Sequence, residues 1–127
     1  MTVRAIMGAA ILIVASVAWA GNVPDITQES VLQSIKANNA PLILDVRTPE
    51  EFKQGHVPGA VNIPHTEVAN RLAELGGKKD RDMVVYCEKG GRAAKAANVL
   101  TKEGFTNVKH LVGDMSAWRD ENLPTEK

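Results

Sequence analysis

Short apolar runs alternate along the chain with helical patterns, and this alternation restricts the fold more than any other feature. The apolar runs lie at residues 41–46 (PLILDV), 60–63, 83–86 (MVVY) and 108–112. Between them, apolar residues recur every three or four positions, which indicates helices. Continuous apolar runs, as opposed to strictly alternating ones, are typical of parallel strands that are covered on both faces. We therefore expect an α/β fold with a parallel sheet and helices on both faces.

Polar residues and glycines predict where the helices begin and end. Thr27 has the character of an N-cap for a first helix, which ends near Asn38. Thr48 and Glu51 have the spacing of a capping box, with Pro49 at the first helical position. The other helices expected are 66–75, about 92–103, and a last one that holds Trp118 and has Asp114 as its N-cap.

The first twenty residues, MTVRAIMGAAILIVASVAWA, have the layout of a secretory signal peptide. Arg4 is followed by an apolar segment, and Ala-Trp-Ala stands before Gly21. An uncleaved membrane anchor is the alternative, but the segment is shorter than the ~18 apolar residues of a spanning helix. We expect a cleaved signal peptide at 1–20, a single domain at 21–127, and export, which in a Gram-negative bacterium means the periplasm.

Charge and composition exclude several classes of partner. The chain has 15 Lys+Arg and 15 Asp+Glu, with no basic block, so nothing indicates binding to nucleic acid or to an anionic membrane. Metal-ligand spacing is absent, so we expect neither a metal nor another cofactor. No heptad pattern suggests assembly, and we expect a monomer.

Cys87 is the only cysteine, and it stands between an apolar strand and a helix. An exported protein with one cysteine has no internal disulfide to form, so its thiol is either buried or used. The residue type alone favours a buried thiol, because free cysteine is among the most often buried residues. The position of Cys87 after a strand favours a functional thiol, because ligands of parallel α/β folds bind at the carboxyl ends of strands.

The loop at 88–92, EKGGR, has the composition of an anion-binding site. Its backbone N–H groups lead into a helix N-terminus. Gly90 and Gly91 allow positive φ angles and a close approach to a ligand. Lys89 and Arg92 add two positive charges that would stabilise a thiolate. Glu88 opposes this, since a nearby carboxylate disfavours a thiolate, and the direction of its side chain is left open.

Three segments resemble a single-domain rhodanese, a thiosulfate sulfurtransferase. They are LILDVRTPEEFKQGHVPGAVNIP (42–64), VVYCEKGGRAAKAANVLTKEGF (84–105) and VKHLVGDMSAW (108–118). With its export signal, the chain looks most like the small periplasmic rhodaneses of bacteria. The resemblance implies a five-stranded parallel sheet and a Cys87 persulfide that carries sulfur from thiosulfate, or a similar donor, to a thiophilic acceptor such as cyanide.

The resemblance also implies roles for other residues. Substrate would bind at Glu88, Lys89, Gly90, Gly91 and Arg92. Asp45 and Arg47 would support the loop, although for Arg47 an ordinary surface ion pair is an equal alternative. His56 would also support the loop, and we expect it to make a structural hydrogen bond instead of acting as a general base, since no base is needed if the thiol is ionised. The chain departs from the family pattern at two positions, Ala93 after the loop and Asp114 in place of a glycine.

Trp118 is expected to anchor the last helix in the core, and His65 and His110 show no partner pattern.

Other functions of the chain remain open. A persulfide carrier or binding module would use the same loop with little turnover of thiosulfate. A thiol redox sensor is weakened by the absence of a second cysteine in the chain. A phosphatase is disfavoured because four residues, not the five of related phosphatases, separate Cys87 from Arg92. A sulfur-accepting protein is a further conceivable partner.

Overall fold

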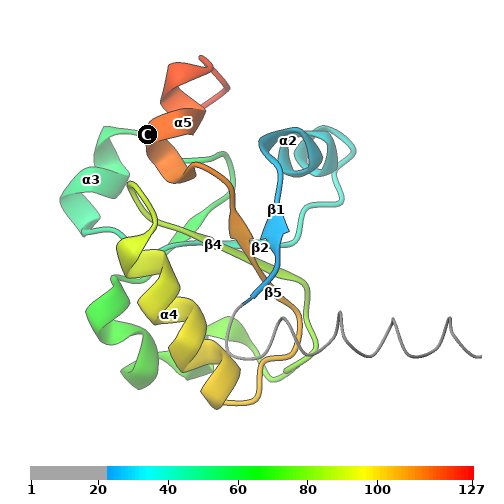
Figure 1. Ribbon diagram of the computed structural model, residues 1–127, viewed down its shortest axis with the longest axis vertical. Helices are drawn as coiled ribbons and strands as arrows, with labels where there is room; N and C mark the ends of the chain where they lie inside the picture. The colour runs from blue at the N-terminus through cyan, green and yellow to red at the C-terminus, as the bar shows by residue number, and fades with distance from the viewer. Residues whose placement is uncertain (1–22) are drawn as a thin grey trace, which may run out of the picture.

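A computed structural model describes residues 23–127, so the expected signal peptide at 1–20 lies outside the described residues. Five parallel strands form one sheet in the order β1-β5-β4-β2-β3 (Figure 1). The strands are β1 (Asp25–Ile26), β2 (Leu42–Asp45), β3 (Val61–Asn62), β4 (Met83–Tyr86) and β5 (Val108–Leu111). This confirms the α/β class and the parallel sheet. The patterns in 41–112 predicted four of the five strands, and β1 was missed.

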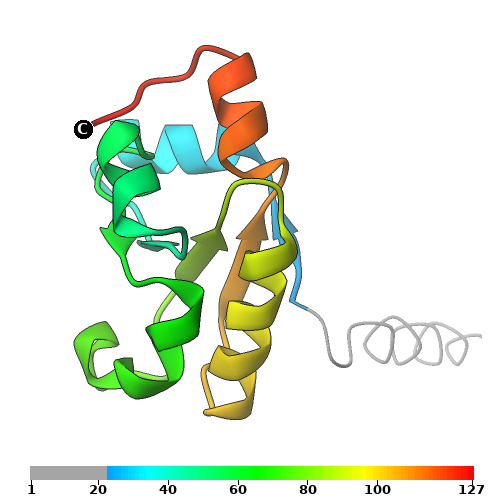
Figure 2. The same cartoon turned by 90° about the vertical axis from the view of Figure 1, so that its left-hand side faces the viewer.

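Helices cover both faces of the sheet, as expected. The helix α4 and two 3-10 helices, η1 and η2, lie on one face, and α2 and α5 lie on the other (Figures 1 and 2). The helices are α2 (Gln28–Lys36), α3 (Pro49–Gln54), η1 (His65–Asn70), η2 (Leu72–Leu75), α4 (Gly91–Lys102) and α5 (Asp114–Asp120). Within residues 23–127, none of them is long and apolar enough to cross a membrane.

Alternate residues of β4 enter the two layers of the core. Val84 and Tyr86 pack with α2 and α5, whereas Val85 and Cys87 pack with α4. This follows from the two-residue period of a strand. The thiol of Cys87 therefore points toward the layer that contains α4.

The neighbouring strands β2 and β4 mark the point where the strand order reverses. The chain leaves β2 toward β3 at one edge and leaves β4 toward β5 on the other side. Asp45 lies opposite Tyr86 in the register of this pair, so both strands end at the same level. In open parallel sheets, ligands bind in the crevice at this reversal. Cys87 is the next residue after β4.

Two predicted N-caps are confirmed. The Thr27 side chain accepts a hydrogen bond from Ser30 N at 3.1 Å at the start of α2. At α3, Thr48 and Glu51 form the full capping box, with Pro49 as the first residue of the helix.

One predicted helix is wrong in type. Residues 66–75 were expected to form a single α-helix, but they belong to η1 and η2, which meet at Arg71. The backbone there makes i→i+3 bonds, including Arg71 N to Val68 O at 3.1 Å. Val68 and Leu75 are still buried, so the apolar spacing was correct. A period near three suits a 3-10 helix as well as it suits an α-helix over so short a segment.

Candidate active site around Cys87

The loop after β4 curls back so that a backbone N–H contacts the cysteine sulfur. Gly90 N donates to Cys87 Sγ at 3.0 Å. Gly90 has φ of +119°, and a Cβ on it would stand 3.2 Å from Asp114 Oδ2. Glycine is therefore required here for both its conformation and its lack of a side chain. Gly91 differs from the expectation: it lacks a positive φ and is the first residue of α4.

Cys87 is both buried and placed at a helix N-terminus. Its exposed fraction is 1%, and its side chain packs in the core layer of α4. The helix α4 begins at Gly91, with Gly90 as its N-cap. The N-terminus of a helix carries a partial positive charge, which attracts anionic groups. Burial of Cys87, which composition favoured, is confirmed, and use of its thiol stays a prediction.

The first turn of α5 forms hydrogen bonds with the loop that contains Cys87. Met115 N donates to Cys87 O and Ser116 N donates to Glu88 O, both at 3.0 Å. In addition, Cys87 N donates to Asp114 Oδ1 at 3.0 Å. First-turn N–H groups of a helix have no partner within the helix, so here they bind the loop carbonyls instead.

Glu88 turns toward two arginines. Its carboxylate pairs with Arg119 of α5 and lies 3.5 Å from Arg47 Nη1. Its side chain is 26% exposed, so it neither points fully into solvent nor faces the sulfur without a partner. The question that the sequence left open is thereby answered: arginine charges neutralise the carboxylate.

Arg92 is paired instead of free. Its guanidinium donates to both carboxylate oxygens of Glu51, at 2.7 and 3.1 Å. The hydrogen bonds from Arg92 lower the pKa of Glu51 to about 2. This pair ties α4 to the first turn of α3. Lys89 lies exposed on the loop, so the positive charge available to a ligand comes chiefly from Lys89 and the backbone N–H groups.

Asp45 and Arg47 form a buried brace behind the loop. Arg47 donates through Nε and Nη2 to the Asp45 carboxylate, the shortest bond being 2.7 Å, and through Nη2 to Gly55 O at 2.8 Å. Arg47 is only 2% exposed, so the alternative of an ordinary surface ion pair is wrong. Asn62 Nδ2 donates to the carbonyls of both residues, at 3.0 and 2.9 Å. Such charge-assisted pairs fix geometry as well as adding energy.

Tyr86 completes this brace. Its hydroxyl donates to Asp45 Oδ2 at 2.7 Å and accepts from Val57 N at 3.1 Å. Burial, assisted by the Asp45 charge, raises the pKa of Tyr86 well above its usual value. The role of Tyr86 was not predicted, because a tyrosine at the end of an apolar strand also fits an ordinary core position.

His56 makes structural contacts, as its sequence context suggested. Its ring stacks on Phe52 with 3.6 Å between centroids, and Nδ1 lies 2.9 Å from Phe52 O. The backbone of His56 exchanges two 2.9 Å hydrogen bonds with Glu126. Trp118 is fully buried, which agrees with a core anchor, and its Nε1 donates to Pro124 O.

Two residues near the other end of the chain have contacts that the sequence did not indicate. His110, for which the sequence showed no partner pattern, pairs with Asp25 and Asp114. Asp114 was expected to be the N-cap of the last helix, yet Gly113 is the N-cap and Asp114 is the first helical residue. The Asp114 side chain serves the cysteine loop, and that long-range bond prevents it from capping its own helix.

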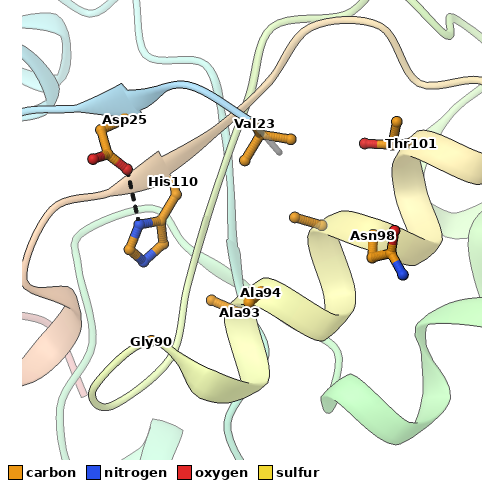
Figure 3. A pocket seen from close by; sticks show the side chains of 9 residues that line it. Val23, Asp25, Gly90, Ala93, Ala94, Asn98, Thr101 and His110 are labelled. Atoms are coloured by element: carbon orange, nitrogen blue, oxygen red, sulfur yellow. Dashed lines mark hydrogen bonds and ion pairs between the residues drawn. The ribbon is translucent and has the colours of Figure 1, made fainter. Parts of the chain in front are cut away.

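Cavities lie on both sides of the loop. One of about 390 Å³ is bordered by Glu88 and Arg119 on one side and by Arg47, Glu51 and Gly55 on the other. A second, of about 290 Å³, reaches Gly90 from behind and is lined by α4, His110 and Asp25 (Figure 3). Within residues 23–127, His, Cys, Asp and Glu side chains form no group of three that could hold a metal.

The site thus combines a buried cysteine sulfur with one N–H donor, Gly90 N, at the start of α4. Such an arrangement stabilises negative charge on the sulfur and on a group that leaves from it.

Comparison with known proteins identifies the family of this chain. Residues 27–121 match the Rhodanese-like domain family. A protein named thiosulfate sulfurtransferase 16, chloroplastic, from Arabidopsis thaliana is 42% identical over 94 residues, which cover 65% of this chain and 78% of that protein. A sulfurtransferase from Allochromatium vinosum is 36% identical over 102 residues, which cover 80% of this chain and 94% of that protein.

Solved structures give the same result. The crystal structure of a rhodanese-related protein from Thermoplasma volcanium superposes with a TM-score of 0.70 at 28% sequence identity. The match covers 81% of this chain and 97% of that chain.

Proposed function

Since this chain belongs to the rhodanese-like family of sulfurtransferases, we propose that it moves sulfane sulfur through a persulfide on Cys87. The donor is thiosulfate or a compound with a similar outer sulfur, and the acceptor is a thiophilic nucleophile such as cyanide. Both are small molecules in this proposal.

The reaction has two displacement steps. The Cys87 thiolate attacks the outer sulfur of thiosulfate, a new S–S bond forms, and the old S–S bond breaks with its electron pair leaving on sulfite. The acceptor then attacks the outer sulfur of the persulfide. Its bond to that sulfur forms as the persulfide bond breaks, and the electron pair returns to Cys87 as thiolate. Neither step needs a proton transfer or an external oxidant, and the cycle is ping-pong covalent catalysis.

The observation that carries this proposal is the 3.0 Å contact from Gly90 N to Cys87 Sγ at the N-terminus of α4. An N–H that points at Sγ stabilises the thiolate before the first attack and again when Cys87 leaves as thiolate in the second step. Lys89, which is exposed on the same loop, supplies positive charge for the sulfite that leaves. Arg92 contributes through its pair with Glu51, which fixes the start of α4.

Intact-mass measurement tests the proposal directly. The protein is incubated with thiosulfate, beside Cys87→Ser and Cys87→Ala. We expect the wild type to gain one sulfur atom, the variants to gain none, and cyanide to remove the sulfur as thiocyanate. No gain with thiosulfate and no gain with a persulfide donor would overturn the proposal.

A persulfide carrier is the second candidate, because the loop geometry serves loading and delivery equally well. The same samples separate the two functions. Many thiocyanate molecules per protein indicate an enzyme, whereas one sulfur loaded and slowly released indicates a carrier. A redox sensor would instead gain oxygen atoms on Cys87 when treated with peroxide and no sulfur with thiosulfate.

We also propose that residues 1–20 direct export and are removed after Ala20, on the strength of their sequence pattern. The mass of the protein recovered from the exported fraction tests this. A mass that begins at Gly21 agrees with cleavage, and a mass that still includes Met1 contradicts it.

A further inference from the structure

Asp114 has a left-handed backbone conformation. Its φ is +54°, directly after Gly113 at +78°. Glycine adopts this conformation freely, and Asp and Asn adopt it more readily than other residues that have a Cβ. The position therefore admits few residue types, and the contacts of the Asp114 carboxylate distinguish aspartate from the others.

The carboxylate is buried beneath the cysteine loop. Asp114 is 1% exposed, and its Oδ1 accepts the N–H of Cys87 at 3.0 Å. Its Oδ2 lies 3.2 Å from where a Cβ of Gly90 would stand. Gly90 is the residue whose N–H contacts the sulfur, so the carboxylate borders both ends of the curl that holds Cys87 Sγ.

His110 supplies the matching positive charge. Its Nε2 lies 3.0 Å from each oxygen of Asp114, and its Nδ1 lies 3.2 Å from Asp25 Oδ1. The hydrogen bond to Asp114 raises the pKa of His110, against the opposing effect of burial. The side chain is 25% exposed and borders the cavity behind the loop, so its proton can exchange with solvent (Figure 3).

The charge balance decides whether this arrangement helps or harms the thiol. A buried carboxylate without a counter-charge would disfavour a thiolate or persulfide anion beside it. A protonated His110 donates one N–H to Asp114 from β5 and the other to Asp25 on β1, and it cancels the charge of the buried Asp114. A deprotonated His110 has a single N–H for the two carboxylates and no positive charge, so the charge of Asp114 is no longer balanced.

We propose that Asp114 and His110 are a pair of positioning residues for the sulfur-bearing loop: the carboxylate holds the Cys87 N–H, and the imidazolium neutralises the carboxylate. This inference rests on the proposed function of Cys87. It adds to that function a dependence of sulfur loading on the protonation of His110.

Two single variants and their double variant test the proposal without any sulfur donor. The rate at which Cys87 is alkylated by iodoacetamide is measured against pH for the wild type, His110→Gln, Asp114→Asn and the double variant. Asn tolerates a positive φ and keeps an oxygen for the Cys87 N–H, so Asp114→Asn removes the negative charge and preserves that hydrogen bond, while an NH₂ group replaces the second oxygen that faces His110.

We expect His110→Gln to raise the pH of half-maximal alkylation by about one unit, which is about a tenfold lower thiolate fraction below that pH. The double variant should return most of the way to the wild type, because the unpaired charge is gone. Rescue by a second substitution is a result that a merely structural role would not give. Identical curves for the wild type and His110→Gln would overturn the proposal.

The loading assay with thiosulfate, run on the same four proteins, separates this inference from the proposed function. Alkylation curves that move as expected in a protein that never gains sulfur would refute the proposed function and leave the charge pairing standing. Loading by the wild type with four coincident alkylation curves would refute the pairing alone.

A variant without the Asp114 side chain tests its positioning role separately from its charge. Asp114→Gly suits the backbone, so it should fold, and it leaves the Cys87 N–H without an acceptor. We expect the rate of its sulfur loading to fall about tenfold or more, because the reacting groups would be misplaced, with no upward shift of the alkylation curve.

If His110→Gln does not fold, an NMR titration of His110 in the wild type and Asp114→Asn replaces it. A lower pKa in Asp114→Asn supports the pairing, and an equal pKa overturns it.

Discussion

Gly90 is the residue on which the shape of the cysteine loop depends most. Its positive φ turns the chain, its N–H contacts Cys87 Sγ, and its missing side chain leaves room for Asp114. The sequence predicted the first of these properties. The room for Asp114 could not be predicted, since Asp114 lies on another element 24 positions along the chain, as the numbering shows.

Gly90→Ala should lower the rate of sulfur loading about tenfold to hundredfold, because the strained loop would move the N–H away from the sulfur. We also expect the free energy of unfolding to fall by about 1–3 kcal/mol. Gly104→Ala is the matched control: its φ is +95°, and a Cβ there has open space. It should lose stability while its folded fraction loads sulfur normally. Equal loading by Gly90→Ala and wild type would contradict the prediction.

The ion pairs of the site differ in how well the sequence predicts them. The Asp45–Arg47 pair spans two positions, and its role followed from the local pattern and the family resemblance. Arg92 and Glu51 are 41 positions apart, and His110 and Asp25 are 85 apart. Since ionic partners at such separations are set by the packing of elements, no local pattern predicts them.

At the scale of elements, β2 and the segment after α3 are joined through the end of β4. The Tyr86 hydroxyl bridges Asp45 Oδ2 and Val57 N. Periodicity predicted β2 and β4 well because their apolar runs are continuous. The two 3-10 helices and the start of α5 were predicted less well, since their backbone form depends on contacts with neighbouring elements.

Tyr86→Phe should lower the free energy of unfolding by about 1–3 kcal/mol, because Val57 N–H would be left buried without an acceptor. Denaturant unfolding measures this as a lower midpoint. An unchanged slope is the control that the unfolded state is the same. A midpoint equal to that of the wild type would mean that water or a shifted carbonyl replaces the phenol.

The pair between α3 and α4 predicts an acid-sensitive stability. The pKa of Glu51 is lowered from 4.5 to about 2 in the folded protein, chiefly by Arg92. Its contribution is therefore fully present above pH 4.5 and is lost as the pH falls toward about 2. We expect the free energy of unfolding of the wild type to fall more steeply through this window than that of Glu51→Gln.

Gln at position 51 preserves the capping box, so the comparison isolates the charge. Glu50→Gln, one position earlier in the same turn, is the control and should keep the wild-type slope. Parallel curves for Glu51→Gln and the wild type would show that Glu51 binds its proton equally in the folded and unfolded states.

At the scale of the whole molecule, the last residues close over the segment that follows α3. Glu126 exchanges two backbone hydrogen bonds with His56, and its Oε1 accepts from Gly59 N at 2.9 Å. The overall architecture was predictable from the alternation of strands and helices together with the family resemblance. This closure was not, because an isolated bridge leaves no periodic pattern in the sequence.

A chain that stops after Pro124 should expose the amides of His56 and Gly59. Hydrogen exchange at both should accelerate more than at Cys87, whose N–H is held by Asp114. Removal of Lys127 alone is the control and should change neither rate. Equal acceleration at all three amides would indicate a global loss of stability instead of a local opening.

The bonds from α5 to the carbonyls of Cys87 and Glu88 have a consequence for biosynthesis. A ribosome delivers the cysteine almost thirty residues before Ser116, as the numbering shows. During that interval the thiol belongs to a nascent chain whose loop has no outer support. We therefore expect the proposed sulfur loading of Cys87 to require a chain that includes α5, and a chain released before Ser116 to gain no sulfur from thiosulfate.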